Sequence, residues 1–375
     1  MSELLPITFV SILLAFLSHK SSDYDPVTLT YKKKEKTFYI VLVICMALFV
    51  GLRTDYNDTH TYKLIYEATP ISDSLEKIFK GIDWKLGSNP GFELTNRILR
   101  YFGASTQTFL MFYAAITVWI HLWFFKKYSR NFAFSVFLYI TLGGYAFALA
   151  AIKQCLATAF CLVATDRYIQ KKYASFVFWV LLGALFHPYA LLYLVVPLMH
   201  FKPWGGKSII VLATAVLAGF ALQPMLGTII DITSAMGENY TIESFSGDGI
   251  NVFRLTVVAV PSIIAFLAKA HIKKEENHTE DLMINLTMLN AEIMFIGLFG
   301  TANYFGRLAN YFQPFQALSI PWLISFFEKN TRKNITIIAI LCYSAFFVYS
   351  MMYTGSFDNA FNRISIIDYF RSLLN

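Results

Sequence analysis

Long apolar runs, separated by short segments that hold most of the charged residues, make up this chain. Only 15% of its residues are charged and 56% are hydrophobic, whereas soluble domains carry about 25% charged residues. A soluble core of 375 residues cannot bury so many apolar side chains. We therefore expect an all-α, polytopic transmembrane helical bundle with about 11–12 spans. Their approximate ranges are 4–18, 37–52, 105–125, 132–149, 152–168, 173–186, 188–199, 208–223, 251–268, 282–300, 308–327 and 335–353.

The distribution of Lys and Arg predicts the orientation of this bundle. With the N-terminus outside, 19 of the 31 Lys and Arg residues fall in short inner loops, as the positive-inside rule requires. The same rule accounts for the net charge of +7, so we expect no nucleic acid partner. In this prediction 1–353 is a single transmembrane domain with outer loops at 53–104 and 224–250, followed by an outer tail, 354–375. Its Ile364–Leu374 part is expected to lie on the membrane surface.

The first apolar run and the cysteines have structural interpretations. The run at 4–18 lacks a basic preceding region and a small-residue cleavage site, so we expect a retained span rather than a signal peptide. All four cysteines lie inside apolar runs and are expected to be core residues without a disulfide or metal role. The sequence also lacks the Walker A loop, the dinucleotide-binding glycine motif and the HExxH zinc motif. We therefore expect no cofactor and no metal.

Four cations stand at or just inside the predicted outer ends of spans: Arg53, Lys153, Arg254 and Arg307. One interpretation is that each is an anchor whose long side chain reaches the membrane surface. Anchoring cations favour the inner face, however, and these four are placed at the outer one. A lipid with a phosphate or diphosphate head is the ligand class that such cations suit, since Arg offers a planar fork and Lys a point charge.

Three further groups are candidates for acid–base chemistry. Asp58 follows Arg53 and stands at the expected start of a helix, where a capping Asp is the alternative. Glu292 lies in the middle of a predicted span, where the alternatives are a structural hydrogen bond and a protonated carboxyl. His187 precedes Pro188 at a break in the segment 173–199 and is either a general base or a structural histidine. That segment is either two short spans or one span with a re-entrant piece.

Aromatic residues on the predicted outer side are weaker candidates. Sugars stack on aromatic faces, and Tyr62 and Tyr311 are among the tyrosines in outer positions. Gln154, next to Lys153, is a candidate orienting group. The alternative is that these side chains belong to the interface belt or to the core.

Several stretches, in their order along the chain, resemble the EpsG family of Wzy-like membrane proteins from bacterial exopolysaccharide and capsule operons. They are GLRTDYNDTHTY (51–62), SNPGFELTNRILRYFG (88–103), AAIKQCLATAF (150–160), LLGALFHPYAL (181–191) and FGRLANYF (305–312). Together the likeness runs from about residue 35 to 330. Two positions depart from the family pattern. Lys153 stands where Arg is usual, which removes a bidentate grip but keeps the charge. Asn57 stands where Gly is usual, and Asn tolerates a left-handed turn.

The resemblance implies a metal-independent membrane glycosyltransferase that polymerises polyprenyl-diphosphate-linked repeat units at the outer face of the bacterial plasma membrane. A GT-C-like architecture is one candidate for its bundle, and a flippase and a chain-length regulator are candidate partners beside membrane lipids. On this hypothesis Arg53, Lys153, Arg307 and, more weakly, Arg254 bind the diphosphate, and Asp58 or His187 acts on the acceptor hydroxyl. Tyr62, Gln154, Tyr311 and Glu292 are secondary members.

Two other classes of function stay open at this point. A flippase or exporter of lipid-linked sugar would use the same cations, but it usually shows repeat symmetry and broken helices at the midplane. We find no internal repeat in the sequence. A non-catalytic synthase subunit would tolerate loss of the outer cations without loss of polymer.

Overall fold

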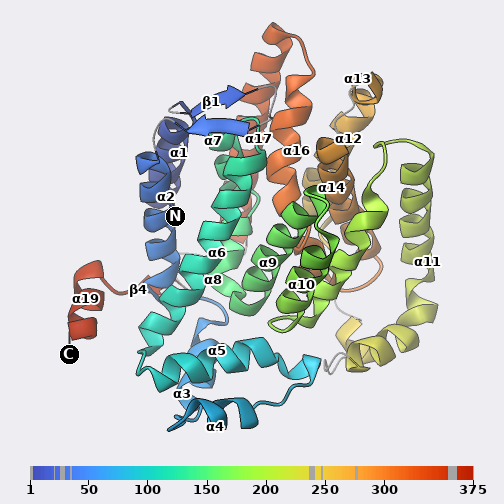
Figure 1. The fold of residues 1–375 in the computed structure, drawn as a ribbon. Coiled ribbons are helices and arrows are strands. Elements are labelled where there is room, and N and C mark those ends of the chain that lie inside the picture. Colours follow the sequence, from blue (N-terminus) through green and yellow to red (C-terminus); the bar gives the residue numbers. More distant parts are fainter. Residues whose placement is uncertain are drawn as a thin grey trace. The chain divides into compact units, whose positions relative to one another are not determined.

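The structure is a computed structural model that describes residues 3–20, 22–25, 30–33, 36–235, 241–245, 248–274, 278–353 and 361–374. Helices make up most of these ranges (Figure 1), which confirms the all-α, polytopic helical fold expected from the sequence. The described strands are short and form two antiparallel pairs, β1 with β2 and β3 with β4. Contacts between elements divide the chain into two compact units. Unit 1 comprises Met1–Val163, Leu181–His187 and Cys342–Asn375, and unit 2 comprises Ala164–Val180 and Pro188–Leu341.

Unit 1 contains the N-terminal helices and the segment at 53–104. Its elements are α1 (Leu4–Lys20), β1 (Ser22–Asp25), β2 (Thr30–Lys33), α2 (Thr37–Gly51), β3 (Arg53–Asp55), α3 (Thr59–Ala68), α4 (Leu75–Lys80), η1 (Leu86–Ser88), α5 (Pro90–Tyr101), α6 (Thr106–Tyr128), α7 (Phe132–Thr141), α8 (Gly144–Ala150), the first part of α9 (Ile152–Ile169), the end of α10 (Tyr173–Ala184), the end of α17 (Lys329–Tyr353), β4 (Asn362–Arg363) and α19 (Ile366–Leu374).

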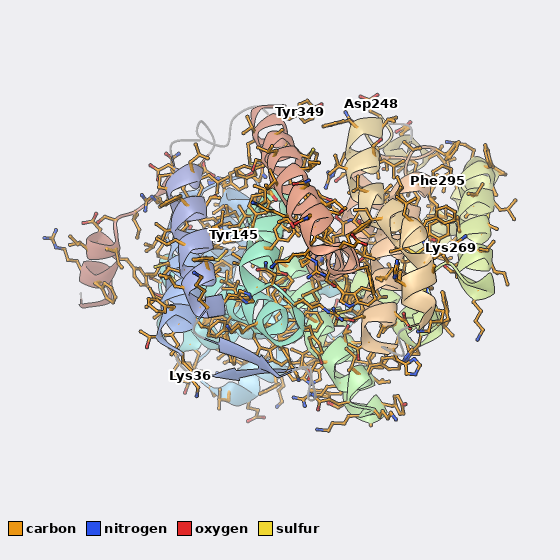
Figure 2. The ribbon with its side chains drawn as sticks, turned by 90° about the horizontal axis from the view of Figure 1, so that it is seen from above. Lys36, Tyr145, Asp248, Lys269, Phe295 and Tyr349 are labelled. Atoms are coloured by element: carbon orange, nitrogen blue, oxygen red, sulfur yellow. The ribbon has the colours of Figure 1, made fainter. Side chains whose placement is uncertain are left out.

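The core of unit 1 forms where α2 packs against α1 and α6. A Cβ atom on Gly51 would collide with Met111, so only glycine lets α2 and α6 approach so closely at this point. Tyr145 donates a hydrogen bond of 2.9 Å from its hydroxyl to the Met46 carbonyl. Figure 2 shows this side chain among the helices, where it is 1% exposed. The buried hydroxyl is thus satisfied by the backbone of a packed helix.

Unit 2 is organised around one helix, α14 (His278–Ile296), which is buried along most of its length. It packs against α11 (Gly206–Ala235), α12 (Val252–Leu267), α15 (Ala302–Asn310) and α16 (Pro314–Ser325). The remaining elements are η2 (Pro188–Met199), η3 (Ile242–Phe245) and α13 (Lys269–Lys274), with the other parts of α9, α10 and α17. Buried amides cross-link the helices of the unit, since Gln316 Nε2 donates to Asn290 Oδ1 at 2.7 Å.

Among the described residues, three helices are long and apolar enough to cross a membrane singly: α6, α11 and Lys329–Met351 of α17. The bent pair α7 and α8 qualifies as one broken span, with a 53° bend near Gly143, where φ is +87°. Five shorter apolar helices, of 10–17 residues, coincide with predicted spans: α1, α2, α10, η2 and α12. The protein is therefore a helical membrane protein, while the full number of crossings stays a prediction. α11 continues through Pro224 to Ala235, so part of the predicted outer loop at 224–250 is helical.

Candidate functional site

Arg53 begins the short strand that follows α2 and is 1% exposed. Its Nη1 donates to the Val50 carbonyl at 2.5 Å, and its Nε donates to Thr59 Oγ1 at 3.1 Å. Burial lowers the pKa of Arg53 to about 10, so the guanidinium stays charged at neutral pH. In the part of the chain that the structure describes, no carboxylate forms an ion pair with it. Arg53 is a buried cation held by neutral oxygens.

The loop after Arg53 turns sharply and exposes a carboxylate. Asn57 has φ of +46°, so the left-handed conformation expected where the family has Gly is confirmed. Asp58 takes the N-cap position of α3, as predicted, but its side chain accepts no capping hydrogen bond from the helix. The helix instead begins with Tyr62 N donating to the Asp58 carbonyl at 3.0 Å. The Asp58 side chain is exposed and is therefore not committed to stabilising the helix end.

Lys153 lies beside the same part of unit 1, in the first turn of α9. Its Nζ stands 5.7 Å from the centroid of the Phe92 ring, a cation–π contact, and the residue is half-buried. Phe92 in turn meets Tyr62 edge to face, with ring centroids 5.9 Å apart. The predicted residues Tyr62 and Lys153, from α3 and α9, thus touch one aromatic ring of α5. Gln154 follows on α9 and is 3% exposed.

His187 is held close to α5 by a tight backbone contact. Gly91 N donates to the Leu185 carbonyl at 2.8 Å, and a Cβ atom on Gly91 would stand 2.9 Å from Leu185 Cβ, too close for any other residue. His187 is 8% exposed and lies between the end of α10 and the 3₁₀ helix η2, so the predicted break at this position is confirmed. The stretches 51–62, 88–103, 150–160 and 181–187 therefore gather in unit 1.

The sequence model of the EpsG family matches residues 36–369, which is most of the chain. The chain belongs to the EpsG family. No curated protein and no solved structure matches it. Membership places the protein, in general terms, among Wzy-like polysaccharide polymerases of glycosyltransferase type, and its apolar helices agree with a membrane location. The roles of single residues are not established by the family match.

The other predicted residues of this EpsG-family protein lie in unit 2. Arg254 is exposed in the first turn of α12, and Arg307 is exposed on α15. Glu292 is 6% exposed within α14. Tyr311 follows α15 and is fully buried, with its carbonyl accepting from Tyr193 Oη at 2.8 Å and the two rings 6.2 Å apart. Its ring therefore packs in the core of unit 2 rather than on an outer surface, where it was expected.

Sequence reasoning missed three residues that support the EpsG-family site in unit 1. Gln107 Nε2 donates to the carbonyls of Gly51 and Arg53 at 2.5 and 3.1 Å, which fixes the backbone on both sides of the strand start. Thr59 accepts from Arg53, and Phe92 carries the contact with Lys153. Thr59 and Phe92 stand inside the family-like stretches and could have been singled out there. Gln107 carries no such signal, because its partners are backbone atoms far away in sequence.

A second finding that the sequence did not suggest is the pairing of β3 with β4. Arg53 lies opposite Arg363 in this antiparallel pair, and the register shifts at a bulge between Arg53 and Asp55. The segment at 361–374 thereby contacts the strand that carries the buried cation. Among the described residues, no group of three or more His, Cys, Asp or Glu side chains is arranged to hold a metal ion.

Proposed function

We propose that this EpsG-family protein polymerises oligosaccharide repeat units carried on polyprenyl diphosphate, at the outer face of the bacterial plasma membrane. The observation that carries the proposal is Arg53, a buried and charged guanidinium whose hydrogen-bond partners, within the described part of the chain, are all neutral. A buried cation without a carboxylate is costly for the fold, and such costs are typical of functional sites. A diphosphate is the anion that this reaction must stabilise.

The proposed reaction is a displacement at the anomeric carbon of the growing chain. The oxygen of an acceptor hydroxyl attacks that carbon, and the bond between the carbon and the diphosphate oxygen breaks. The electron pair of this bond leaves with polyprenyl diphosphate, and the hydroxyl proton passes to a base. Preorganised positive charge at the leaving group lowers the barrier, since it stabilises charge that develops only in the transition state.

Arg53 and Lys153 are the proposed diphosphate ligands in unit 1. Lys153 is half-buried with its ammonium near the Phe92 ring, so the protein does not enclose this side chain completely. Arg53 is more enclosed, and its charge acts through a medium of low dielectric, where its attraction for an anion is strengthened. A charge-assisted contact of this kind contributes ~1.5–3 kcal/mol. If the whole contact is made in the transition state, its loss slows the reaction about ten- to hundred-fold.

Asp58 and His187 are the proposed bases for the acceptor hydroxyl. The exposed carboxylate of Asp58 has no capping role, and His187 stands at the end of α10 next to the backbone of α5. The base must come within hydrogen-bonding reach of the acceptor hydroxyl. Substituting Asp58 and His187 one at a time tests each residue as the base. Tyr62 and Gln154 are proposed to orient the sugar.

The candidate residues of unit 2 are proposed separately from those of unit 1. Arg254 and Arg307 are exposed cations proposed to bind phosphate, while Glu292 and Tyr311 are buried and have weaker proposed roles. A flippase and a chain-length regulator are proposed partners, because lipid-linked units must reach the outer face before they are joined.

Lys153 gives the sharpest test of this proposal. A membrane anchor needs only a long polar chain, whereas a diphosphate ligand needs the positive charge. We expect Lys153→Arg to retain much of the activity and Lys153→Gln to lose long polymer, with single lipid-linked units accumulating. Both variants should insert normally, since Lys153→Arg keeps the charge of the wild type and Lys153→Gln removes a charge from the span, which lowers the cost of insertion. The measurement is polymer length on a gel, beside the membrane abundance of each variant.

The matched control is Lys77→Gln, which neutralises an exposed lysine of the same unit, paired with Asp73 at 2.6 Å. It should leave chain length unchanged. Normal chain length with normal abundance in Lys153→Gln would remove Lys153 from the site. Units that accumulate on the inner leaflet instead of the outer one would favour a flippase.

A further inference from the structure

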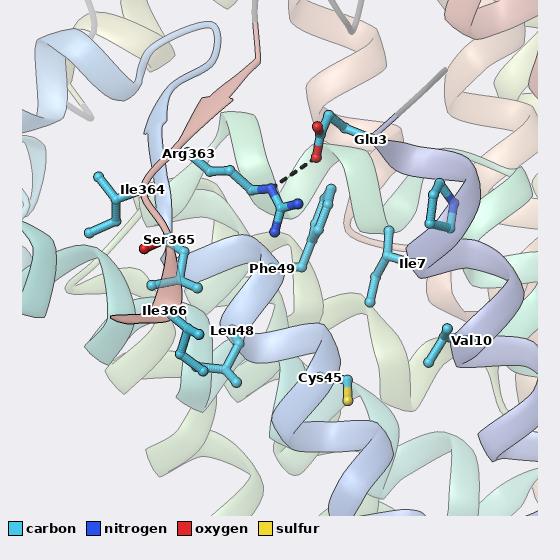
Figure 3. Close-up of a pocket in the computed structure, with 12 residues that line it drawn as sticks. Glu3, Ile7, Val10, Cys45, Leu48, Phe49, Arg363, Ile364, Ser365 and Ile366 are labelled. Carbon is cyan, nitrogen blue, oxygen red and sulfur yellow. Dashed lines mark hydrogen bonds and ion pairs between the residues drawn. The ribbon is translucent and has the colours of Figure 1, made fainter. Parts of the chain in front are cut away.

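A cavity of about 900 Å³ lies in unit 1 between the first two helices and the segment at 363–366 (Figure 3). Ile7 and Val10 of α1 form one wall, and Leu48 and Phe49 of α2 form the other. This volume lies at the upper end of the about 300–1,000 Å³ that is usual for ligand pockets. None of the residues proposed for the polymerase reaction lines this cavity.

The cavity changes from polar to apolar along the two helices. At its mouth, Arg363 Nε and Glu3 Oε2 form an ion pair of 2.9 Å, and the two side chains are 46% and 39% exposed. Figure 3 shows this pair at one end, with Ile7 and Val10 following along α1 and Leu48 along α2. A molecule that fits this order has a charged head and an apolar chain that runs parallel to the helices.

The segment 363–366, which lines a further side of the open cavity, is fixed to unit 1 by its backbone. Ile364 N donates to the Leu52 carbonyl at 3.0 Å, next to the pairing of β4 with β3. Ser365 then begins α19 with a capping interaction, in which Asp368 N donates to Ser365 Oγ at 3.0 Å. The following helix exposes Ile366, Ile367 and Phe370, at 42%, 60% and 54%. An amphipathic helix with such a face lies in the membrane interface, where lipid heads meet acyl chains.

We propose that this cavity binds a zwitterionic glycerophospholipid, with one acyl chain between α1 and α2 and the head at the ion pair. The phosphate of the lipid lies at Arg363, and its ammonium group lies at Glu3. One cation and one anion at the mouth match a head with one charge of each sign. The apolar chain replaces water along Ile7, Val10 and Leu48, which is the burial that stabilises binding.

The charge at the mouth also argues against the substrate's own lipid as the occupant. Polyprenyl diphosphate carries more than one negative charge and no positive one. Glu3 would repel it, and one guanidinium, that of Arg363, cannot balance more than one negative charge. The inference therefore stands apart from the polymerase proposal, and either can fail without the other.

Photo-crosslinking in vesicles tests the site directly. The full chain is reconstituted in vesicles of phosphatidylethanolamine and phosphatidylglycerol that contain a trace of phosphatidylethanolamine with a diazirine near the end of one acyl chain. After irradiation, the labelled peptides are mapped by mass spectrometry. We expect labels to concentrate on residues that line the cavity, Val10 of α1 and Cys45 and Leu48 of α2. The exposed Ile44 of α2, which does not line the cavity, should carry fewer labels.

Two kinds of variant decide between a site and ordinary surrounding lipid. Leu48→Trp fills the cavity and should lower labelling of α1 about tenfold. The matched control is Ile44→Trp, at an exposed position of α2 outside the cavity, and it should leave the labelling of α1 unchanged. Val10→Trp repeats the test from the other wall if Leu48→Trp inserts poorly. Equal labelling in the filled variants and the control would overturn the site.

The head assignment has its own outcomes. Arg363→Gln and Glu3→Gln should each lower labelling by about tenfold, the effect of losing one charge-assisted contact. Unchanged labelling in both would overturn the assignment of a zwitterionic head. Loss of labelling on addition of polyprenyl diphosphate, but not of unlabelled phosphatidylethanolamine, would show that the substrate's lipid is the occupant and would also overturn it.

Discussion

The two units handle their buried charges differently. In unit 2, the carboxylate of Asp281, whose side chain is 3% exposed, accepts an ion pair of 2.9 Å from Lys202. In unit 1, the guanidinium of Arg53 is equally enclosed, and among the residues that the structure describes it donates hydrogen bonds to a carbonyl and a hydroxyl but to no carboxylate. A charge with an opposite partner is stabilised within the fold, whereas a cation held by neutral oxygens keeps its attraction for an incoming anion.

A second arginine of unit 1 makes the contrast sharper. Arg97 is 12% exposed in its side chain, donates to the Gly81 carbonyl at 2.8 Å, and forms an ion pair of 2.7 Å with Glu93 one helical turn away. It has the same backbone-holding contact as Arg53 but a carboxylate as well. The difference between the two residues is thus the missing counter-charge, and this is the feature that the predictions below test.

Substitution of Arg53 should have the largest effect. Arg53→Ala removes the charge and leaves its two acceptors without this donor, so we expect polymer synthesis to fall about ten- to hundred-fold or more. Arg53→Lys keeps the charge but not the planar fork and should fall between the wild type and the alanine variant. Polymer length and yield, normalised to folded protein in the membrane, measure both.

Arg97→Ala is the matched control for this prediction. It should lower thermal stability, because Glu93 loses its partner, while chain length stays near normal in the protein that remains folded. If Arg97→Ala and Arg53→Ala reduce polymer to the same degree at equal abundance, the missing carboxylate has no functional meaning. Rescue of Arg53→Ala polymer length by nothing more than a lower growth temperature would likewise assign Arg53 to stability alone.

Breaking the charge pair of unit 2 should have a smaller and purely structural effect. Lys202→Ala leaves the Asp281 carboxylate buried without its cation, which we expect to cost ~1–3 kcal/mol after allowance for the exposure of Lys202. Asp281→Asn should cost less, since a neutral amide can be buried more readily than a charge. The melting temperature of the purified protein measures both, and a double-mutant cycle gives the coupling. A change in polymer chain length without a change in melting temperature would contradict this structural assignment.

Sequence patterns indicated the helical membrane fold, because apolar runs and their charged flanks are local features. They also indicated the break at His187 and the left-handed Asn57, since proline and asparagine act through their own backbone. The site was harder to foresee. Gln107 binds the carbonyls of Gly51 and Arg53, which are 54 or more residues away in the sequence, and β4 pairs with β3 across about 300 residues. No local sequence pattern predicts contacts over such separations.

Burial was the property that the sequence misjudged most. Tyr311 was expected on an outer surface, yet its ring lies in the core beside Tyr193. Arg53 was expected at or just inside the outer end of a span, and its exposure of only 1% was not foreseen. In both cases an amphipathic side chain at the end of a helix has two energetically similar placements, and contacts with distant elements decide between them.

The smallest effect is expected from acidification, through His200 of unit 2. Burial is the main cause that lowers the pKa of His200 below its usual value of 6.5, with the neighbouring His278 acting in the same direction and Asp281 in the opposite one. Nδ1 of the ring and the Tyr168 hydroxyl form a hydrogen bond of 3.0 Å. The unfolded chain therefore binds a proton more readily than the folded chain does. Stability from this group is complete above about pH 7 and is lost as the pH falls through 6.5 and below. His200 is exposed in part, so water screens the effect, and the slope should stay well under ~1.4 kcal/mol per pH unit.

We expect the melting temperature to fall less between pH 7.5 and about pH 5.5 in His200→Asn, which keeps an acceptor for Tyr168, than in the wild type. His60→Asn, an exposed histidine of unit 1, should leave the wild-type slope unchanged. Equal slopes in the wild type and His200→Asn would exclude His200 as the group that links the stability of unit 2 to pH.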